Sequence, residues 1–114
     1  MHDFIKRDLK NAVSQYLKIF PVVAILGPRQ CGKSTLIKTL SQQWGNVIYL
    51  DLQKDADLNK LLHPILFFES NPDKIICIEE IQLVPELFSI LRSVIDANRK
   101  NGRFILLGSA SRDL

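Results

Sequence analysis

Residues 22–34 read VVAILGPRQCGKS, and this stretch decides the fold. Its first five residues are apolar and rich in β-branched side chains, which is typical of a parallel strand buried on both faces. The next eight residues, from Gly27 to Ser34, satisfy the spacing G-x-x-x-x-G-K-[ST]. A helix is expected to follow from about residue 34 to residue 43. The order of strand, glycine-containing loop and helix is the one that a phosphate-binding loop requires.

The composition of the loop suits it to wrap around phosphate oxygens. Gly27 and Gly32 allow the backbone to approach closely, and the helix that follows adds unpaired N–H groups and a positive dipole end. Lys33 would neutralise the terminal phosphates, and the hydroxyl of Ser34 would complete the oxygen shell of Mg²⁺. The candidate nucleotide-binding residues are Gly27, Pro28, Arg29, Gln30, Cys31, Gly32, Lys33, Ser34 and Thr35.

The rest of the chain alternates strands with helices. Further strands are expected at residues 47–51, 75–78 and 104–107, and further helices at 4–20, 55–63 and 85–99. Residues 65–68 fit either a helix or a buried strand. This alternation predicts an α/β fold with a parallel sheet and right-handed crossovers. We interpret Tyr16 and Phe20, on the first helix, as core residues rather than residues that stack on a base.

Two adjacent carboxylates, Glu79 and Glu80, follow the apolar residues of the third strand. Ligands of open α/β sheets lie beyond the carboxyl ends of the strands, so both acids are expected near the bound phosphates. We assign Glu79 to Mg²⁺ and Glu80 to the water that attacks the phosphate. The alternative is a pair of solvated surface glutamates, which the coupling to the phosphate loop disfavours.

Two more polar residues end strands at the same edge. Ser109 follows the fourth strand and could donate a hydrogen bond to the terminal phosphate or the attacking water, with Ser111 as a second candidate; the alternative is a small polar turn. Asp51 ends the second strand and either contacts the metal shell or caps the next segment, and we favour the structural role.

The overall composition excludes several classes of protein. With 46% hydrophobic and 24% charged residues among 114, the chain is an ordinary globular domain, and its longest apolar run is too short to span a membrane. The charged N-terminus does not fit a signal peptide, and two cysteines are too few for a disulfide scaffold or a metal cluster. The net charge is +3 and its basic residues are scattered, so nucleic acid is not indicated as a partner. We therefore expect a cytoplasmic protein.

Four segments together resemble the AAA+ superfamily of P-loop ATPases, and within it AAA domain family 14. They are GPRQCGKSTL at 27–36, YLD at 49–51, EEIQLVPEL at 79–87 and RFILLGSAS at 103–111. In that bacterial and archaeal group a nucleotide-binding domain precedes a C-terminal domain of unknown function. The resemblance implies a three-layer core with the strand order 5-1-4-3-2, with Lys33, Ser34 and Glu79 at the phosphates and Mg²⁺, Glu80 as catalytic base and Ser109 as first sensor.

Two departures from the family pattern bear on function. Glu79 stands where the family usually has aspartate, so a longer side chain must fold back to keep the Mg²⁺ geometry, which would reduce turnover. The fifth strand, the arginine finger and the second sensor would lie beyond residue 114. We therefore expect an N-terminal part of a longer protein, with a helix at residues 1–20 packed on a truncated core at 21–114. The missing strand would leave the first strand as an open edge, which favours pairing with another chain and a homo-oligomer.

These observations lead to three hypotheses. The first is a domain that binds ATP and hydrolyses it with Mg²⁺ as part of a longer protein, acting on an unknown protein partner. The second is a nucleotide-binding module that regulates or interacts without hydrolysis. The third is a small-molecule kinase, which the two adjacent acids disfavour because activating water suits hydrolysis.

Overall fold

The computed structural model describes residues 2–27 and 32–109. Four parallel strands form one sheet in the order β1-β4-β3-β2. The strands are β1 (Val22–Gly27), β2 (Val47–Asp51), β3 (Ile75–Glu79) and β4 (Phe104–Ser109). The predicted α/β fold is confirmed, and the order of these four strands agrees with the one that the resemblance implies.

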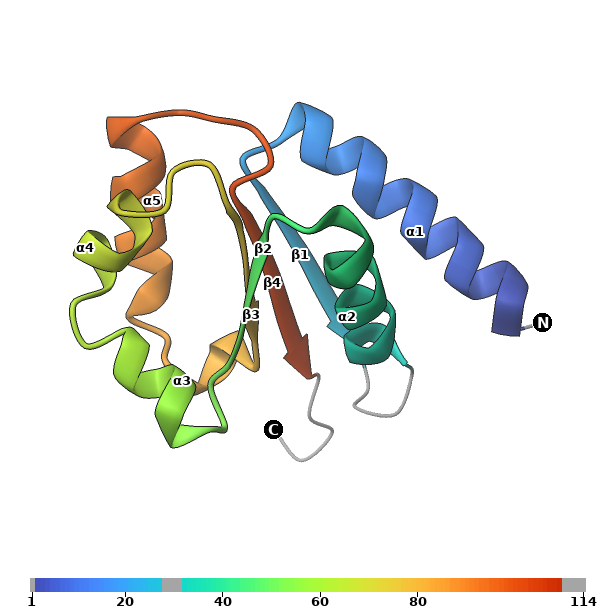
Figure 1. Ribbon diagram of the computed structural model, residues 1–114, viewed down its shortest axis with the longest axis horizontal. Coiled ribbons are helices and arrows are strands. Elements are labelled where there is room, and N and C mark those ends of the chain that lie inside the picture. Colours follow the sequence, from blue (N-terminus) through green and yellow to red (C-terminus); the bar gives the residue numbers. More distant parts are fainter. Residues whose placement is uncertain (1, 28–31, 110–114) are drawn as a thin grey trace.

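Helices cover both faces of the sheet, which makes three layers (Figure 1). One face carries α1 (His2–Ile19) and α2 (Lys33–Trp44). The other face carries α3 (Asp55–Lys60), α4 (Pro64–Glu69) and α5 (Leu87–Ala97), with a 3-10 turn, η1 (Ile81–Leu83), between β3 and α5. Because a parallel strand must be followed by a crossover, this alternation puts every strand in the same direction.

Each face of the sheet has its own hydrophobic core, because successive strand residues point to opposite faces. The core under α1 and α2 contains Val13, Leu17, Val23, Ile37, Leu40, Cys77, Ile105 and Leu107. The core under α4 and α5 contains Leu50, Leu52, Leu61, Phe68, Ile76, Ile78, Ile81, Leu87, Leu91, Val94, Phe104 and Leu106. Burying this many aliphatic and aromatic side chains is the main stabilising contribution to a domain of this size.

Several expectations from the sequence need correction. Tyr16 and Phe20 are about half exposed (50% and 48%), because over residues 8–19 α1 buries a narrow stripe that contains Val13 and Leu17. The prediction that they are core residues is therefore wrong. The ambiguous segment 65–68 is helical and belongs to α4, which Pro64 begins. A proline is well tolerated in the first turn of a helix, where its missing N–H would have no intrahelical acceptor.

The first strand is less buried than its apolar sequence suggests. Ala24 and Leu26 of β1 are exposed, with Leu26 at 72%, so the prediction of burial on both faces is wrong for these residues. The reason is that, in the part of the chain that the structure describes, β1 pairs only with β4 and lies at an edge of the sheet. Over the same described residues, no helix combines the length and apolar character that a membrane crossing needs.

Candidate functional site

The carboxyl ends of the four strands meet at one edge of the sheet. The last paired residues are Gly27 of β1 opposite Ser109 of β4, and Asp51 of β2 opposite Glu79 of β3. Helix α2 begins at the same edge, directly after Gly32. This convergence follows from the parallel order of the strands, and it is where ligands bind in open α/β sheets.

A hollow of about 230 Å³ opens at this edge. Its lining residues come from α2, from the turn after β2, and from the ends of β3 and β4; they are Lys33, Ser34, Gln53, Glu79, Glu80 and Ser109. Lys33 and Glu80 are almost completely buried, with 3% and 5% of their surface exposed. The structure thus brings the two acids, the lysine and the two serines together, although they lie up to 76 positions apart in the sequence.

The start of α2 has a backbone suited to anion binding. Gly32 caps the helix in the left-handed region, with a φ of 82° that favours glycine. The first intrahelical bond runs from the N–H of Leu36 to the carbonyl of Gly32 (3.0 Å). The first turn of a helix directs its N–H groups beyond the end of the helix, and the helix dipole makes this end positive. The amino-terminal end of α2 is therefore suited to bind a phosphate group.

Two hydroxyl groups converge on the carboxylate of Glu79. Ser34 Oγ donates a short hydrogen bond to Glu79 Oε1, and Tyr49 donates its hydroxyl proton to Glu79 Oε2 at 3.0 Å. A serine hydroxyl and a carboxylate oxygen in contact are hard oxygen donors, which is the ligand type that Mg²⁺ takes. The residues present therefore fit Mg²⁺, with Ser34 and Glu79 as the side chains that would hold it.

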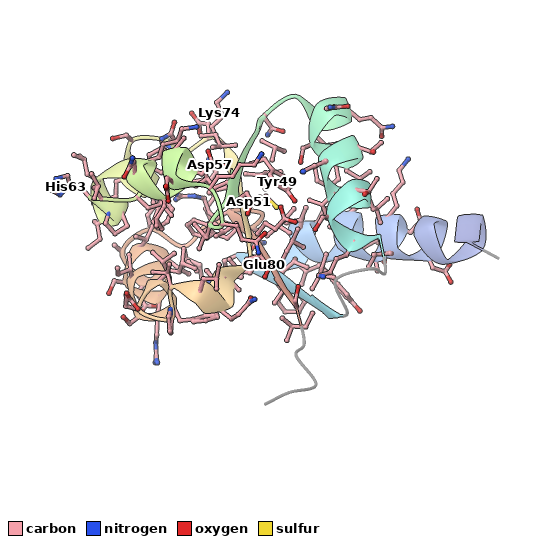
Figure 2. All side chains as sticks on the ribbon, turned by 90° about the horizontal axis from the view of Figure 1, so that it is seen from below. Tyr49, Asp51, Asp57, His63, Lys74 and Glu80 are labelled. Atoms are coloured by element: carbon pink, nitrogen blue, oxygen red, sulfur yellow. The ribbon has the colours of Figure 1, made fainter. Side chains whose placement is uncertain are left out.

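The carboxylate of Glu80 also has a donor on each oxygen. Ser109 Oγ donates to Glu80 Oε1 at 2.7 Å, and Gln82 Nε2 donates to Glu80 Oε2 at 2.8 Å. The Glu80 backbone lies in the left-handed region with a φ of 63°, which is uncommon for a residue with a side chain. Figure 2 shows Glu80 near the centre of the molecule, at the end of β3. These contacts hold the carboxylate in one orientation at the rim of the hollow.

Burial sets the protonation states of Tyr49 and Cys77, which lie near Glu79. Burial, with a smaller effect of Cys77 and Glu79, raises the pKa of Tyr49 well above its usual value. The Tyr49 hydroxyl therefore keeps its proton and serves as a donor to Glu79. Burial also raises the pKa of the Cys77 thiol, so Cys77 is a neutral core residue at physiological pH.

Other candidates lie outside the hollow or outside the described residues. Thr35 is exposed in the first turn of α2, and its carbonyl accepts a bond from Thr39 (2.9 Å). Asp51 accepts the backbone N–H of Gln53 (3.0 Å) in the turn after β2, which is a structural role, although α3 itself begins after Lys54 with no side-chain cap. The remaining loop candidates, Pro28, Arg29, Gln30 and Cys31, lie outside the described residues, as does Ser111.

Sequence reasoning missed three residues of the site. Gln53 lines the hollow, Tyr49 binds Glu79, and Gln82 binds Glu80. Two of them carried a signal, because Gln82 lies two positions after the second acid and Tyr49 two positions before the end of a strand. The Tyr49 contact could not be assigned before the register between β2 and β3 was known, and the Gln82 contact depends on the left-handed turn at Glu80.

A family model and two relatives match the chain. The family model AAA_14, described as an AAA domain, matches residues 20–114. Two uncharacterized proteins, one of Mycobacterium bovis and one of Mycobacterium tuberculosis, are each 36% identical to the chain over 109 residues. That match covers 96% of the chain but only 24% of each relative, so the chain spans about a quarter of their length. No solved structure matches the chain significantly.

The family match includes all four strands, the loop before α2 and both acids. It also agrees with the resemblance that the loop, the acids and the strand ends carry in the sequence. An AAA domain indicates nucleotide binding in general. The chain therefore belongs to the AAA domain family AAA_14.

Proposed function

We propose that this chain binds ATP at the start of α2 and hydrolyses it with Mg²⁺. The observation that carries the proposal is the meeting of Lys33 and Ser34 with Glu79 and Glu80 around one hollow at the carboxyl edge of the sheet. Binding would involve the residues from Gly27 to Thr35. Lys33 would lie against the terminal phosphates, and the first N–H groups of α2 would donate to phosphate oxygens.

Ser34 and Glu79 would hold Mg²⁺, because their oxygens are already in contact. When bound, the ion neutralises the negative charge that develops on the phosphates as the terminal bond breaks. The hydroxyl of Ser34 can rotate, so it can turn its lone pairs toward a cation instead of donating to Glu79. Glu79 then keeps one carboxylate oxygen directed at the same place.

Glu80 would act as the general base. Its carboxylate is buried and held by Ser109 and Gln82, so its orientation is fixed before the reaction. A water molecule between this carboxylate and the terminal phosphorus would lose a proton to Glu80 as its oxygen bonds to phosphorus. The bond between the terminal phosphorus and the bridging oxygen breaks, and ADP leaves with that electron pair. The proton on Glu80 is then released to phosphate or solvent.

The binding step is tested with the Lys33→Ala variant and a fluorescent ATP analogue in the presence of Mg²⁺. We expect the affinity to fall by more than tenfold, because the variant removes the cation that faces the phosphates. Lys74→Ala is the matched control, since Lys74 is exposed at the amino end of β3. Lys33 is buried, so urea unfolding must show that the variant is folded. Equal affinity of a folded variant and the wild type would refute the proposal.

The hydrolysis step is tested with Glu80→Gln and a phosphate-release assay. The amide keeps the size of the side chain but cannot accept the proton, so we expect at least a hundredfold loss of turnover with nucleotide binding retained. Undiminished turnover would remove Glu80 from this role.

A second candidate function is nucleotide binding without hydrolysis, in a regulatory or interaction module. The observation that favours it is that Glu79 Oε1, the oxygen nearest Ser34, already accepts a hydrogen bond from the Ser34 hydroxyl. If this bond occupies Oε1 in the complex as well, that oxygen is less available to Mg²⁺, and the ion is held too loosely for turnover. Tight binding of ATP with no phosphate release by the wild type would favour this alternative.

The organisation beyond the site also stays a proposal. We propose that residues 1–20 pack as a helix on a core formed by 21–114, that the protein is cytoplasmic, and that it acts on a protein partner. Among residues 2–27 and 32–109, β1 pairs on one side with β4, and the edge left on its other side supports pairing with a second copy of the chain. Analytical ultracentrifugation tests the proposed self-association, and a monomer at high protein concentration would refute it.

A further inference from the structure

The carboxylate of Glu79 is held from two elements. Ser34 contributes a donor from α2, and Tyr49 contributes one from the middle of β2. The serine hydroxyl has one proton and two lone pairs, so it can offer a lone pair to a cation whether or not it keeps this bond. Tyr49 donates to the other oxygen, so its bond can persist in both states.

The register of the sheet explains how Tyr49 reaches Glu79. Tyr49 lies opposite Cys77, and Asp51 lies opposite Glu79, so the tyrosine is the diagonal neighbour of the glutamate on the α2 face of the sheet. Diagonal neighbours are ~7–8 Å apart, a distance that only long side chains bridge. Figure 2 shows Tyr49 and Asp51 close to one another beside α2.

Two features fix the orientation of the tyrosine. The ring lies partly buried against the core under α2, and Lys38 Nζ of that helix is 5.4 Å from the ring centroid. A ring held between a helix and a strand loses little further freedom when its hydroxyl makes a hydrogen bond. The length of the glutamate matters equally, because a carboxylate one C–C bond shorter (~1.5 Å) would lie beyond hydrogen-bond reach of this hydroxyl.

We propose that Tyr49 is a positioning residue that holds Glu79 Oε2, so that Oε1 stays directed at Ser34 and at the cation that Ser34 would share. This inference rests on the proposed function, because it gives Tyr49 a role toward the Mg²⁺ of the ATP complex. Tyr49 touches neither nucleotide nor cation. Its effect is therefore confined to binding that depends on Mg²⁺.

The test compares the affinity for a fluorescent ATP analogue in EDTA with its affinity as Mg²⁺ is raised. We expect Tyr49→Phe to leave the affinity in EDTA unchanged and to raise the Mg²⁺ concentration for half-maximal binding about tenfold or more, the loss of one hydrogen bond to a charged group. An unfolded fraction would lower the signal in both conditions but would not change this Mg²⁺ midpoint. Tyr16→Phe is the matched control, because Tyr16 is half exposed on α1.

A double-mutant cycle with Glu79→Asp isolates the contact. Because the aspartate does not reach the hydroxyl, adding Tyr49→Phe to Glu79→Asp should change the Mg²⁺ midpoint by less than twofold. If the wild type binds the analogue but Tyr49→Phe has the same midpoint, or shifts it equally in both backgrounds, the role of Tyr49 is refuted and the proposed function stands. If the wild type does not bind the analogue with Mg²⁺, the proposed function fails and this inference fails with it.

Discussion

Gly108 offers a way to move Gln82 without replacing it. A Cβ added at Gly108 would lie 2.8 Å from Leu26 Cδ2 and 3.2 Å from Gln82 Oε1. Both atoms are the far ends of side chains, and Leu26 is 72% exposed, so each can rotate away. We therefore expect Gly108→Ala to change the free energy of unfolding by less than about 1 kcal/mol, the range typical of a tolerated substitution.

The effect on the site should be larger than the effect on stability. When Gln82 moves, the bond from its Nε2 to Glu80 Oε2 (2.8 Å) is lost or lengthened. One such bond contributes about 1 kcal/mol, which corresponds to about fivefold in rate if it orients the carboxylate in the transition state. Gln82→Ala should give the same fivefold loss of ATP turnover. Combining it with Gly108→Ala should lose no more, because both act on one contact.

Phosphate release and urea unfolding measured on the two single variants and the double variant decide the matter. Turnover of Gly108→Ala equal to that of the wild type, while Gln82→Ala is impaired, would refute the argument that the two residues share one contact. So would losses that multiply in the double variant. Destabilisation of more than about 2 kcal/mol by Gly108→Ala would show that the neighbouring side chains do not yield.

Three further predictions concern other polar side chains. Arg103 donates to the carbonyl of Phe68 at 2.7 Å, but its buried Nε has no acceptor among the described residues. Arg103→Met should therefore change the free energy of unfolding by less than about 1 kcal/mol, whereas Arg103→Ala should lower it by about 3 kcal/mol because it leaves a cavity. Equal losses for the two variants in urea unfolding would contradict this prediction. The pKa of Asp57 is lowered mainly because it accepts the backbone N–H of Asp51 (2.9 Å), so Asp57→Asn should cost about 1 kcal/mol at pH 7. Because the pKa of Asp57 is lower in the folded state, the difference in free energy of unfolding between the wild type and Asp57→Asn should vanish as the pH falls through the folded-state pKa, below the ordinary aspartate value of about 4. A constant difference between pH 7 and pH 3 would contradict this role of Asp57. Ser109 donates to the proposed base, Glu80, so Ser109→Ala should lower ATP turnover about fivefold without changing Mg²⁺-dependent binding of the ATP analogue. A loss of binding would instead indicate that Ser109 contacts phosphate directly.

The strands could be predicted from the sequence because local patterns specify them. Residues 75–78 are mostly β-branched and follow the turn residues 70–73, which favours a buried strand over a helix, and they lie in the sheet. The segment 65–68 was ambiguous because a short apolar run fits a helix and a strand equally, and the proline before it decides for a helix. The exposure of Tyr16 and Phe20 depends on how α1 lies against the sheet, which no local pattern contains.

In the candidate site too, some features follow from local sequence patterns and others depend on how the strands pair. The edge at which Lys33, Ser34 and the two acids meet follows from strand direction alone, so their proximity was predictable. The partners of the acids depend on register and on single rotamers. Tyr49 reaches Glu79 only because β2 and β3 pair with Asp51 opposite Glu79, and a shift of one residue would turn the tyrosine to the other face.

The left-handed backbone at Glu80 explains how two adjacent acids serve one site. Successive residues of a strand point to opposite faces, so a β3 continued past Glu79 would direct Glu80 into the apolar core beneath α5, next to Ile78. A φ of 63° turns the chain instead, and the Glu80 carboxylate meets the Ser109 hydroxyl at the rim. This conformation costs about 1–2 kcal/mol for a residue with a side chain. Strain retained beside a buried, hydrogen-bonded carboxylate points to a functional requirement at that position, because stability alone would favour glycine there.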